Sequence, residues 1–385
     1  MKKTKLFTLL VLVVLLASLV LSACAKKADD DVLRIGYIGA LSGETAVWGQ
    51  AGLNGMLLTA KEINAAGGIL GKQVEIIGLD GRGDPTDSVN AFRRLVTEEK
   101  VIAVVGTNFS SCNIAMAPIA DQLQIPLIAT AASNPKVTVD ENGVLHPYSF
   151  RIGFIDPFQG QVLANLASNE LGAKTAGIIY DIGSDYSTGL AQYFEEQFVA
   201  NGGTIVAKVE GHSGDNDFRS QLSVIAKANP DVIMVPWIYK DVALIANQAR
   251  ELGVTAPLLG GDGWDSPELI SMAAEAIEGS FYTSQPSFAN PVTKPFYDAY
   301  MVEYANLVPE TEALFGRDGL YWIKEAFERA GEATPAALRE ALETTTQFDG
   351  LMGSMAIDPA THNPAKPASV YTFTNGERIW YGDYK

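Results

Sequence analysis

The sequence predicts an α/β fold built as two similar lobes with parallel sheets. Short runs rich in Val, Ile and Leu alternate with segments whose apolar residues recur at helical spacing, which is typical of strand–helix units. Several of these runs are apolar throughout, as expected for strands that helices cover on both faces. The alternation begins at residue 32 and again near residue 155 of 385, and a chain of this length exceeds what one core usually holds.

The elements of the first half follow in order. Strands are expected at 32–38, 74–79, 101–105 and 126–129. Apolar residues at helical spacing over 53–63 predict a helix that Gly67 and Gly68 end. Asp84 followed by Pro85 is an N-cap with proline at the first helical position, so the next helix should begin there.

The second half repeats the pattern. Strands are expected at 176–180, 204–209, 231–235 and 257–259. The predicted helix 241–252 has one apolar face, and Ser266 before Pro267 is a second cap-plus-proline start. Residues 296–345 are mostly helical in pattern, and 352–380 are short strands and turns. Periodicity leaves open which lobe these late segments join.

The N-terminus has the pattern of an export signal. Three lysines within the first five residues precede an apolar run over 6–20, and the small residues Ser22 and Ala23 follow. The run is shorter than the roughly 20 residues that span a bilayer. We therefore expect residues 1–23 to be a signal peptide and the protein to be exported; an uncleaved anchor helix is the alternative.

Cys24 directly after these small residues resembles the lipobox of bacterial lipoproteins. The resemblance implies that its thiol carries a diacylglycerol, that residues 24–31 form a charged tether, and that the protein stays on the cell membrane, facing the periplasm or the exterior. A plain secretory signal with an incidental cysteine is the alternative. Cys112, the only other cysteine, then has no partner, so the fold must rest on its core.

Composition argues against several function classes. The chain has 28 Lys and Arg against 45 Asp and Glu, a net charge of −17, which makes nucleic acid a poor partner. Its three histidines are far apart and lack metal-site spacing, so no metal is expected. The glycines of 36–43 do not form a dinucleotide fingerprint, and no P-loop is present, so no cofactor is expected.

A series of short segments carries a family resemblance. In order they are IGYIGALSG at 35–43, WG at 48–49, EINAAGG at 62–68, Asp80, DP at 84–85, GTNFSS at 106–111, TAAS at 130–133, DY at 185–186, Gly189, DF at 217–218, ANQAR at 246–250 and GDG at 261–263. Together, over almost the whole chain after the signal, they resemble the leucine/isoleucine/valine-binding proteins. These are type I periplasmic solute-binding proteins of ABC importers.

The resemblance implies two Rossmann-like lobes joined by three crossover strands near Arg151, Phe281 and Asp358. One lobe would be 32–150 with 282–357, and the other 151–281 with 358–385. A free amino acid would lie between them, and the protein, a monomer and not an enzyme, would deliver it to an ABC permease with its ATPase subunits. The alternatives are a receptor for an amide, urea or aromatic acid on the same fold, and a hydrolase using Ser110.

A free amino acid needs donors for its carboxylate and acceptors for its ammonium. Ser110 and Ser111 follow a strand and precede a helix, where unpaired N–H groups and the helix dipole favour an anion. The family match assigns Ser110, with the backbone of Phe109, to the carboxylate, and Asp262, between glycines at a strand end, to the ammonium. The alternatives are that Ser110 is an N-cap and Asp262 a turn residue.

The family match supplies further contacts. It implies backbone contacts from the small segment Ala131-Ala132, a hydroxyl contact from Ser133, and a capping ring from Tyr186. Trp48 would line the side-chain pocket.

The family's binding tyrosine aligns with Ile238, so Trp237 and Tyr239 are its candidate replacements. A pocket of Trp48, Phe109, Ile238 and Trp264 would be apolar and would favour a branched-chain, other aliphatic or aromatic amino acid.

Overall fold

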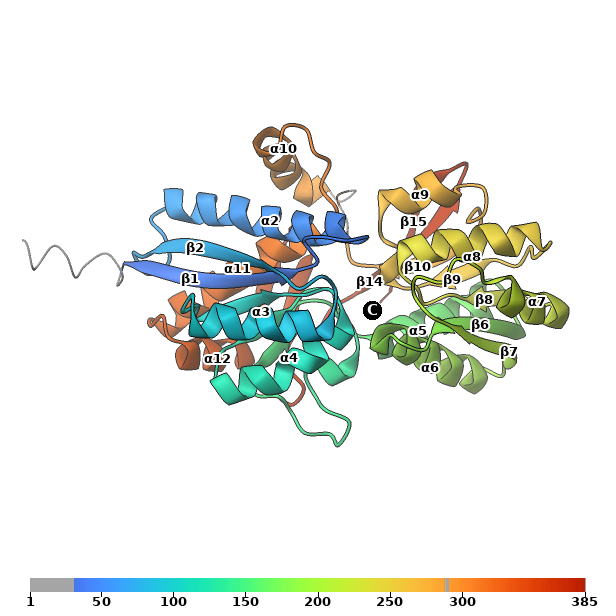
Figure 1. The fold of residues 1–385 in the computed structure, drawn as a ribbon, viewed down its shortest axis with the longest axis horizontal. Coiled ribbons are helices and arrows are strands. Elements are labelled where there is room, and N and C mark those ends of the chain that lie inside the picture. Colours follow the sequence, from blue (N-terminus) through green and yellow to red (C-terminus); the bar gives the residue numbers. More distant parts are fainter. Residues whose placement is uncertain (1–30, 287, 289–290, 385) are drawn as a thin grey trace, which may run out of the picture.

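The computed structural model describes residues 31–286, 288 and 291–384. The predicted signal peptide and Cys24 lie outside these residues. Two sheets form two lobes that lie side by side (Figure 1), so the α/β fold with parallel sheets is confirmed. Within the described chain, no helix is both long enough and apolar enough to cross a bilayer.

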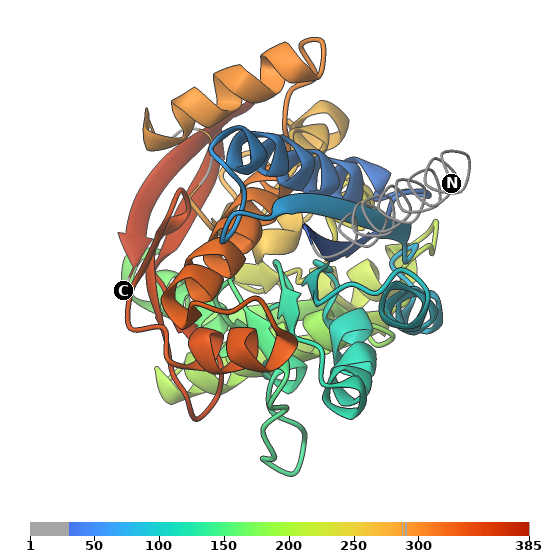
Figure 2. The same ribbon diagram turned by 90° about the vertical axis from the view of Figure 1, so that its left-hand side faces the viewer.

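The first lobe is a five-stranded parallel sheet in the order β2-β1-β3-β4-β5. Its strands are β1 (Val32–Gly39), β2 (Gln73–Asp80), β3 (Ala103–Gly106), β4 (Leu127–Ala129) and β5 (Ser149–Arg151). The early helices are α2 (Ala46–Ala65), α3 (Pro85–Thr97) and α4 (Ser110–Leu123), and the short 3₁₀ helix η1 is Pro135–Val137. One core joins the sheet to α2 and a second joins its other face to α3 and α4. The end-on view shows helices on both sides of the sheet (Figure 2).

The second lobe is a seven-stranded sheet in the order β15-β14-β10-β9-β8-β6-β7. Its strands are β6 (Thr175–Asp181), β7 (Thr204–Gly211), β8 (Val232–Met234), β9 (Leu258–Gly260), β10 (Phe281–Ser284), β14 (Ala368–Thr374) and β15 (Glu377–Tyr384). Its helices are α5 (Asp156–Asn165) with the π-turn η2 (Leu166–Glu170), α6 (Asp185–Ala200), α7 (Arg219–Ala228), α8 (Tyr239–Glu251), η3 (Asp262–Trp264) and α9 (Pro267–Ala273). β14 pairs antiparallel with β10 and β15, so this sheet is parallel only in part.

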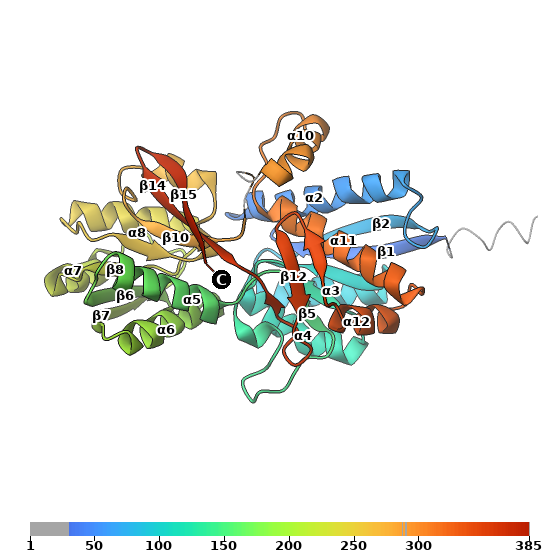
Figure 3. The same ribbon diagram turned by 180° about the vertical axis from the view of Figure 1, so that it is seen from behind.

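The late segments divide between the lobes. The helices are η4 (Pro291–Thr293), α10 (Lys294–Glu303), α11 (Glu312–Ala330) and α12 (Pro335–Glu343), and a small sheet holds β11 (Phe348–Gly350), β12 (Gly353–Ile357) and β13 (Pro364–Ala365). α11 packs tightly on α2. The absence of a side chain at Gly316 allows this approach, since a Cβ there would lie 2.1 Å from the Gly52 carbonyl oxygen. From behind, β12 lies over the first lobe and β14 and β15 over the second (Figure 3).

Strand pairing bears on the expected lobe boundaries. A boundary at 281/282 would cut β10, all of whose residues pair in the second sheet. A boundary at 357/358 would separate β13 from its partner β12. We propose that both boundaries lie a few residues later.

Candidate functional site

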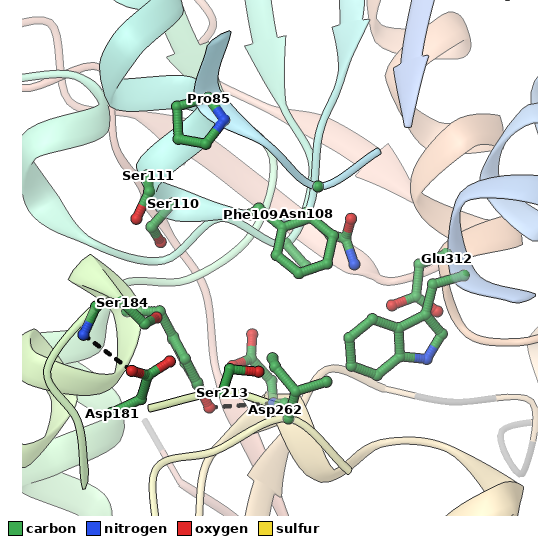
Figure 4. Close-up of a pocket in the computed structure, with 17 residues that line it drawn as sticks. Pro85, Asn108, Phe109, Ser110, Ser111, Asp181, Ser184, Ser213, Asp262 and Glu312 are labelled. Atoms are coloured by element: carbon green, nitrogen blue, oxygen red, sulfur yellow. Dashed lines mark hydrogen bonds between the residues drawn. The ribbon is translucent and has the colours of Figure 1, made fainter. Parts of the chain in front are cut away.

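A cavity of about 260 Å³ lies between the lobes, at the carboxyl ends of both sheets (Figure 4). Side chains from both lobes line it. They are Trp48, Gly83, Pro85, Asn108, Phe109, Ser110, Ser111, Ala131, Asp181, Gly183, Ser184, Tyr186, Ser213, Ile238, Asp262, Gly263 and Glu312.

The N-terminus of α4 forms one pole of this cavity. The helix begins at Ser110 with Phe109 as its N-cap, so the alternative that Ser110 caps the helix is wrong. Ser110 Oγ accepts a hydrogen bond from the Asn134 N–H at 3.2 Å, and its hydroxyl proton remains available to an acceptor. The first N–H groups of a helix have no intrahelical partner, and the dipole is positive here, so this pole suits a carboxylate.

Asp262 forms the opposing pole. It is the first residue of η3, and its carboxylate accepts a bond from Gln159 Nε2 at 3.1 Å, while its own N–H donates to Gln159 Oε1 at 3.0 Å. The Tyr186 hydroxyl beside it accepts from the Gly263 N–H at 3.1 Å. Burial raises the pKa of Asp262 to about 7, although bonds from Gln159 and Tyr186 oppose the shift. An ammonium group beside it would favour the charged carboxylate.

Apolar side chains also line the cavity. Trp48 is 3% exposed and packs on the Tyr239 ring with centroids 5.0 Å apart. Phe109 from the first lobe and Ile238 from the second pack against the same hydrophobic cluster. A chain of methylene or methyl groups can lie between these walls without exposing polar atoms.

The lobes also touch each other directly around the cavity. The Asp185 N–H donates to Ser111 Oγ at 3.2 Å, and Asn134 Nδ2 donates to the Asp185 carbonyl at 2.7 Å. On the other side, the Tyr239 hydroxyl donates to the Glu44 carbonyl at 3.3 Å. These contacts join the two lobes on both sides of the cavity.

The family model for periplasmic binding proteins matches residues 32–378. The chain is a type I solute-binding protein of the leucine/isoleucine/valine-binding family. Leucine-binding protein LivK of Thermotoga maritima is 34% identical, with 91% of this chain and 98% of that one covered and a TM-score of 0.84. LivJ of Streptococcus pneumoniae, solved with isoleucine, is 33% identical with the same coverage and a TM-score of 0.80.

A curated relative agrees with these structures. The leucine-, isoleucine-, valine-, threonine- and alanine-binding protein of Pseudomonas aeruginosa is 28% identical over 331 residues, covering 85% of this chain and 86% of its own length. A solute-binding role outside the cytoplasm, in association with an ABC transporter, follows from the family.

The structure places eight of the twelve predicted ligand residues of this solute-binding protein on the cavity wall. They are Trp48, Phe109, Ser110, Ser111, Ala131, Tyr186, Ile238 and Asp262. Residues 237–239 alternate in direction as they leave β8, so only the middle one reaches the cavity. Trp237 Nε1 instead donates to the Ile179 carbonyl at 2.8 Å, and Tyr239 packs behind Trp48.

Three further expectations need correction. The Ala132 carbonyl accepts from Arg151 at 2.8 Å, and Ser133 is buried beside Asp156, so neither lines the cavity. Trp264 also lies away from it, because its indole packs under Gly260 and donates to the Val235 carbonyl at 2.9 Å. The expected apolar pocket therefore loses one of its walls.

The cavity contains polar residues that the sequence reasoning did not single out. Asp181 ends β6 and Ser184 caps α6, so the rule that found Ser110, a polar residue between strand end and helix start, would have found both. Asn108 and Ser213 are loop residues with no such signal. Glu312 comes from the first turn of α11, far away in sequence.

Two acids with raised pKa values, one in the cavity and one near it, predict how stability depends on pH. Burial raises the pKa of Asp262 to about 7 and that of Glu310 to about 8. Between the ordinary pKa values and these raised ones, the folded protein binds more protons than the unfolded chain, so stability falls as pH rises. The melting temperature of the ligand-free protein should drop from pH 5 to pH 8, and less so in Glu310→Gln. A melting temperature that climbs over this range in both proteins would contradict the assignment.

Proposed function

We propose that this protein captures a free α-amino acid between its lobes and delivers it to an ABC importer. The observation that carries the proposal is the pair of opposed poles in one cavity. The α4 N-terminus with Ser110 and Ser111 offers donors, and Asp262 from the other lobe offers an acceptor. A zwitterion carries the complementary groups on a single carbon.

Closure of the lobes is the working step. A ligand can favour the closed arrangement only through contacts that the open one lacks. An amino acid held by Ser110 on one lobe and Asp262 on the other makes such contacts. The hydrogen bond from the Asp185 N–H to Ser111 Oγ also stabilises the closed arrangement. The permease would therefore meet a closed, loaded form.

The apolar walls of Trp48, Phe109 and Ile238 support a branched-chain or other apolar group for the part of the side chain that lies between them. One relative named as a leucine-binding protein and another solved with isoleucine support the same choice. The cavity is complete within one chain, which suits a monomer. A lipid on Cys24 would hold the loaded protein beside its permease.

The test is thermal unfolding of the purified protein with amino acids, amides and aromatic acids. A ligand at about 100 times its Kd should add roughly 2.7 kcal/mol to the free energy of unfolding. We expect L-amino acids to stabilise and D-amino acids, as matched controls, to do so much less. Stabilisation by an amide or an aromatic acid alone would instead favour those receptors, and a ligand converted during incubation would indicate a hydrolase.

A further inference from the structure

Glu312 is a buried acid at one end of the cavity. It is 9% exposed and lines the cavity wall. In Figure 4 its carboxyl group lies at the end away from Ser110 and Ser111, with Asp262 on the facing wall between them. An amino acid held at these two poles would therefore direct its side chain toward Glu312.

The carboxyl group of Glu312 lacks a partner for one oxygen. Oε2 is buried, and no group in the described part of the chain hydrogen-bonds to it. The indole Nε1 of Trp48, also on the cavity wall, is buried without a partner as well. Buried polar groups are nearly always hydrogen-bonded, so the unpartnered Glu312 oxygen indicates that a ligand supplies a donor to it. The Trp48 N–H is itself a donor and needs an acceptor instead.

The charges around Glu312 specify what that partner is. The residues that line the cavity include three acids, Asp181, Asp262 and Glu312, and neither lysine nor arginine. Asp181 accepts from the Gly183 N–H at 2.8 Å, and Asp262 accepts from Gln159.

Behind Glu312 lie more acids rather than a base. Burial, together with the charges of Glu310 and Asp265, raises the pKa of Glu312. Arg378, the nearby guanidinium, is already paired with Asp265. A ligand whose only ammonium group lies at Asp262 provides no basic partner for the Glu312 carboxyl group.

We propose that Glu312 selects an amino acid whose apolar stem ends in a nitrogen that donates hydrogen bonds, with a cationic nitrogen preferred to an amide. The inference rests on the proposed function, because it takes the position of the side chain from the poles that hold the α-carbon. The stem lies between Trp48, Phe109 and Ile238, and the terminal nitrogen donates to Glu312. A purely aliphatic side chain of the same length leaves the Glu312 carboxyl group unpaired.

Isosteric ligands test this directly. L-Ornithine and L-norleucine differ only in an ammonium in place of a terminal methyl, and L-lysine and L-2-aminoheptanoate form a second pair. Calorimetric titration of the purified protein should show at least about 30-fold tighter binding of the cationic member, as expected for a buried charge pair that loses one partner. L-Glutamine provides the amide arm and should bind between the two.

Variants of Glu312 test whether this residue, and not the other acids of the cavity, sets the preference for a cationic side chain. In Glu312→Gln the cation preference should shrink at least tenfold, and in Glu312→Leu norleucine should bind as well as ornithine or better. Glu75→Gln is the matched control, because this exposed acid pairs with Arg34 and does not line the cavity, so the ratio of affinities should stay as in the parent protein.

The outcomes distinguish this inference from the function on which it rests. Equal binding of ornithine and norleucine by the parent protein, or a preference for norleucine, overturns the role of Glu312 but keeps an amino-acid receptor. Failure of every amino acid to bind overturns the proposed function itself. Because the parent protein alone gives the decisive ratio, the result does not depend on Glu312→Leu folding.

Discussion

Asp262→Asn should strongly weaken amino-acid binding while leaving the ligand-free fold intact. The amide oxygen can still accept the bond from Gln159, and the backbone bond to Gln159 Oε1 is unaffected. The ligand ammonium, in contrast, loses the carboxylate it pairs with inside a buried cavity. Removing one partner of a buried charge pair costs about 2–5 kcal/mol, so affinity should fall by about 30-fold to several thousand-fold.

Calorimetric titration of the best ligand checks this, with the melting temperature of the ligand-free variant as a test of folding. Asp217→Asn is the matched control, because that acid is exposed on the second lobe and pairs with Arg219 at 3.2 Å. An affinity unchanged in Asp262→Asn would refute the assignment of Asp262 to the ammonium and would favour a receptor for a ligand without one.

Asp265→Ala should cause a large loss of stability. Asp265 is 5% exposed. Its carboxylate accepts hydrogen bonds from Ser284 Oγ at 2.6 Å and Thr311 Oγ1 at 3.1 Å, and it forms an ion pair with Arg378. The substitution leaves three buried hydroxyl groups, those of Ser284, Thr311 and Tyr282, without this acceptor and removes the partner of the partly buried Arg378 guanidinium. Breaking a buried ion pair from one side costs about 3–5 kcal/mol.

Denaturant unfolding measures this loss, and a surface pair provides the comparison. Glu75 pairs with Arg34 at 3.1 Å but is 53% exposed, so Glu75→Ala should cost about 0–1 kcal/mol. Equal losses in the two variants would show that the Asp265 network adds no more than a surface pair. Because Thr311 comes from the first lobe, Asp265→Ala should also weaken ligand binding through the contact between lobes.

Helix starts were predicted correctly where neighbouring residues alone determine them. Asp84 caps α3 by accepting from the Asp87 N–H at 2.9 Å, and Ser266 caps α9, as their cap-plus-proline patterns indicated. The predicted start of α2 was late by seven residues, because 46–52 has no apolar periodicity. There the helix is fixed by close packing, as a Cβ on Gly49 would lie 2.1 Å from the Ala40 carbonyl oxygen.

The difference between local pattern and distant packing also explains which residues of the cavity the sequence could reveal. Ser110 and Asp262 follow strand ends, where the topology of a parallel sheet brings polar residues together, so pattern and family resemblance sufficed to find them. Glu312 reaches the cavity only because α11 packs on α2, more than two hundred residues earlier in the chain. No local signal encodes that contact. Its effect, an acid at the end of a cavity expected to be apolar, therefore appeared only in three dimensions.

The glycine contact between α2 and α11 also has a consequence for the order of assembly. A chain that emerges N-terminus first presents α2 long before Gly316 and its helix exist, so the face of α2 that they cover stays open to water. β6 to β10, in contrast, come from one continuous stretch of 175–284. We expect that stretch to gain structure first during vectorial emergence, and the first lobe to close only once α11 arrives.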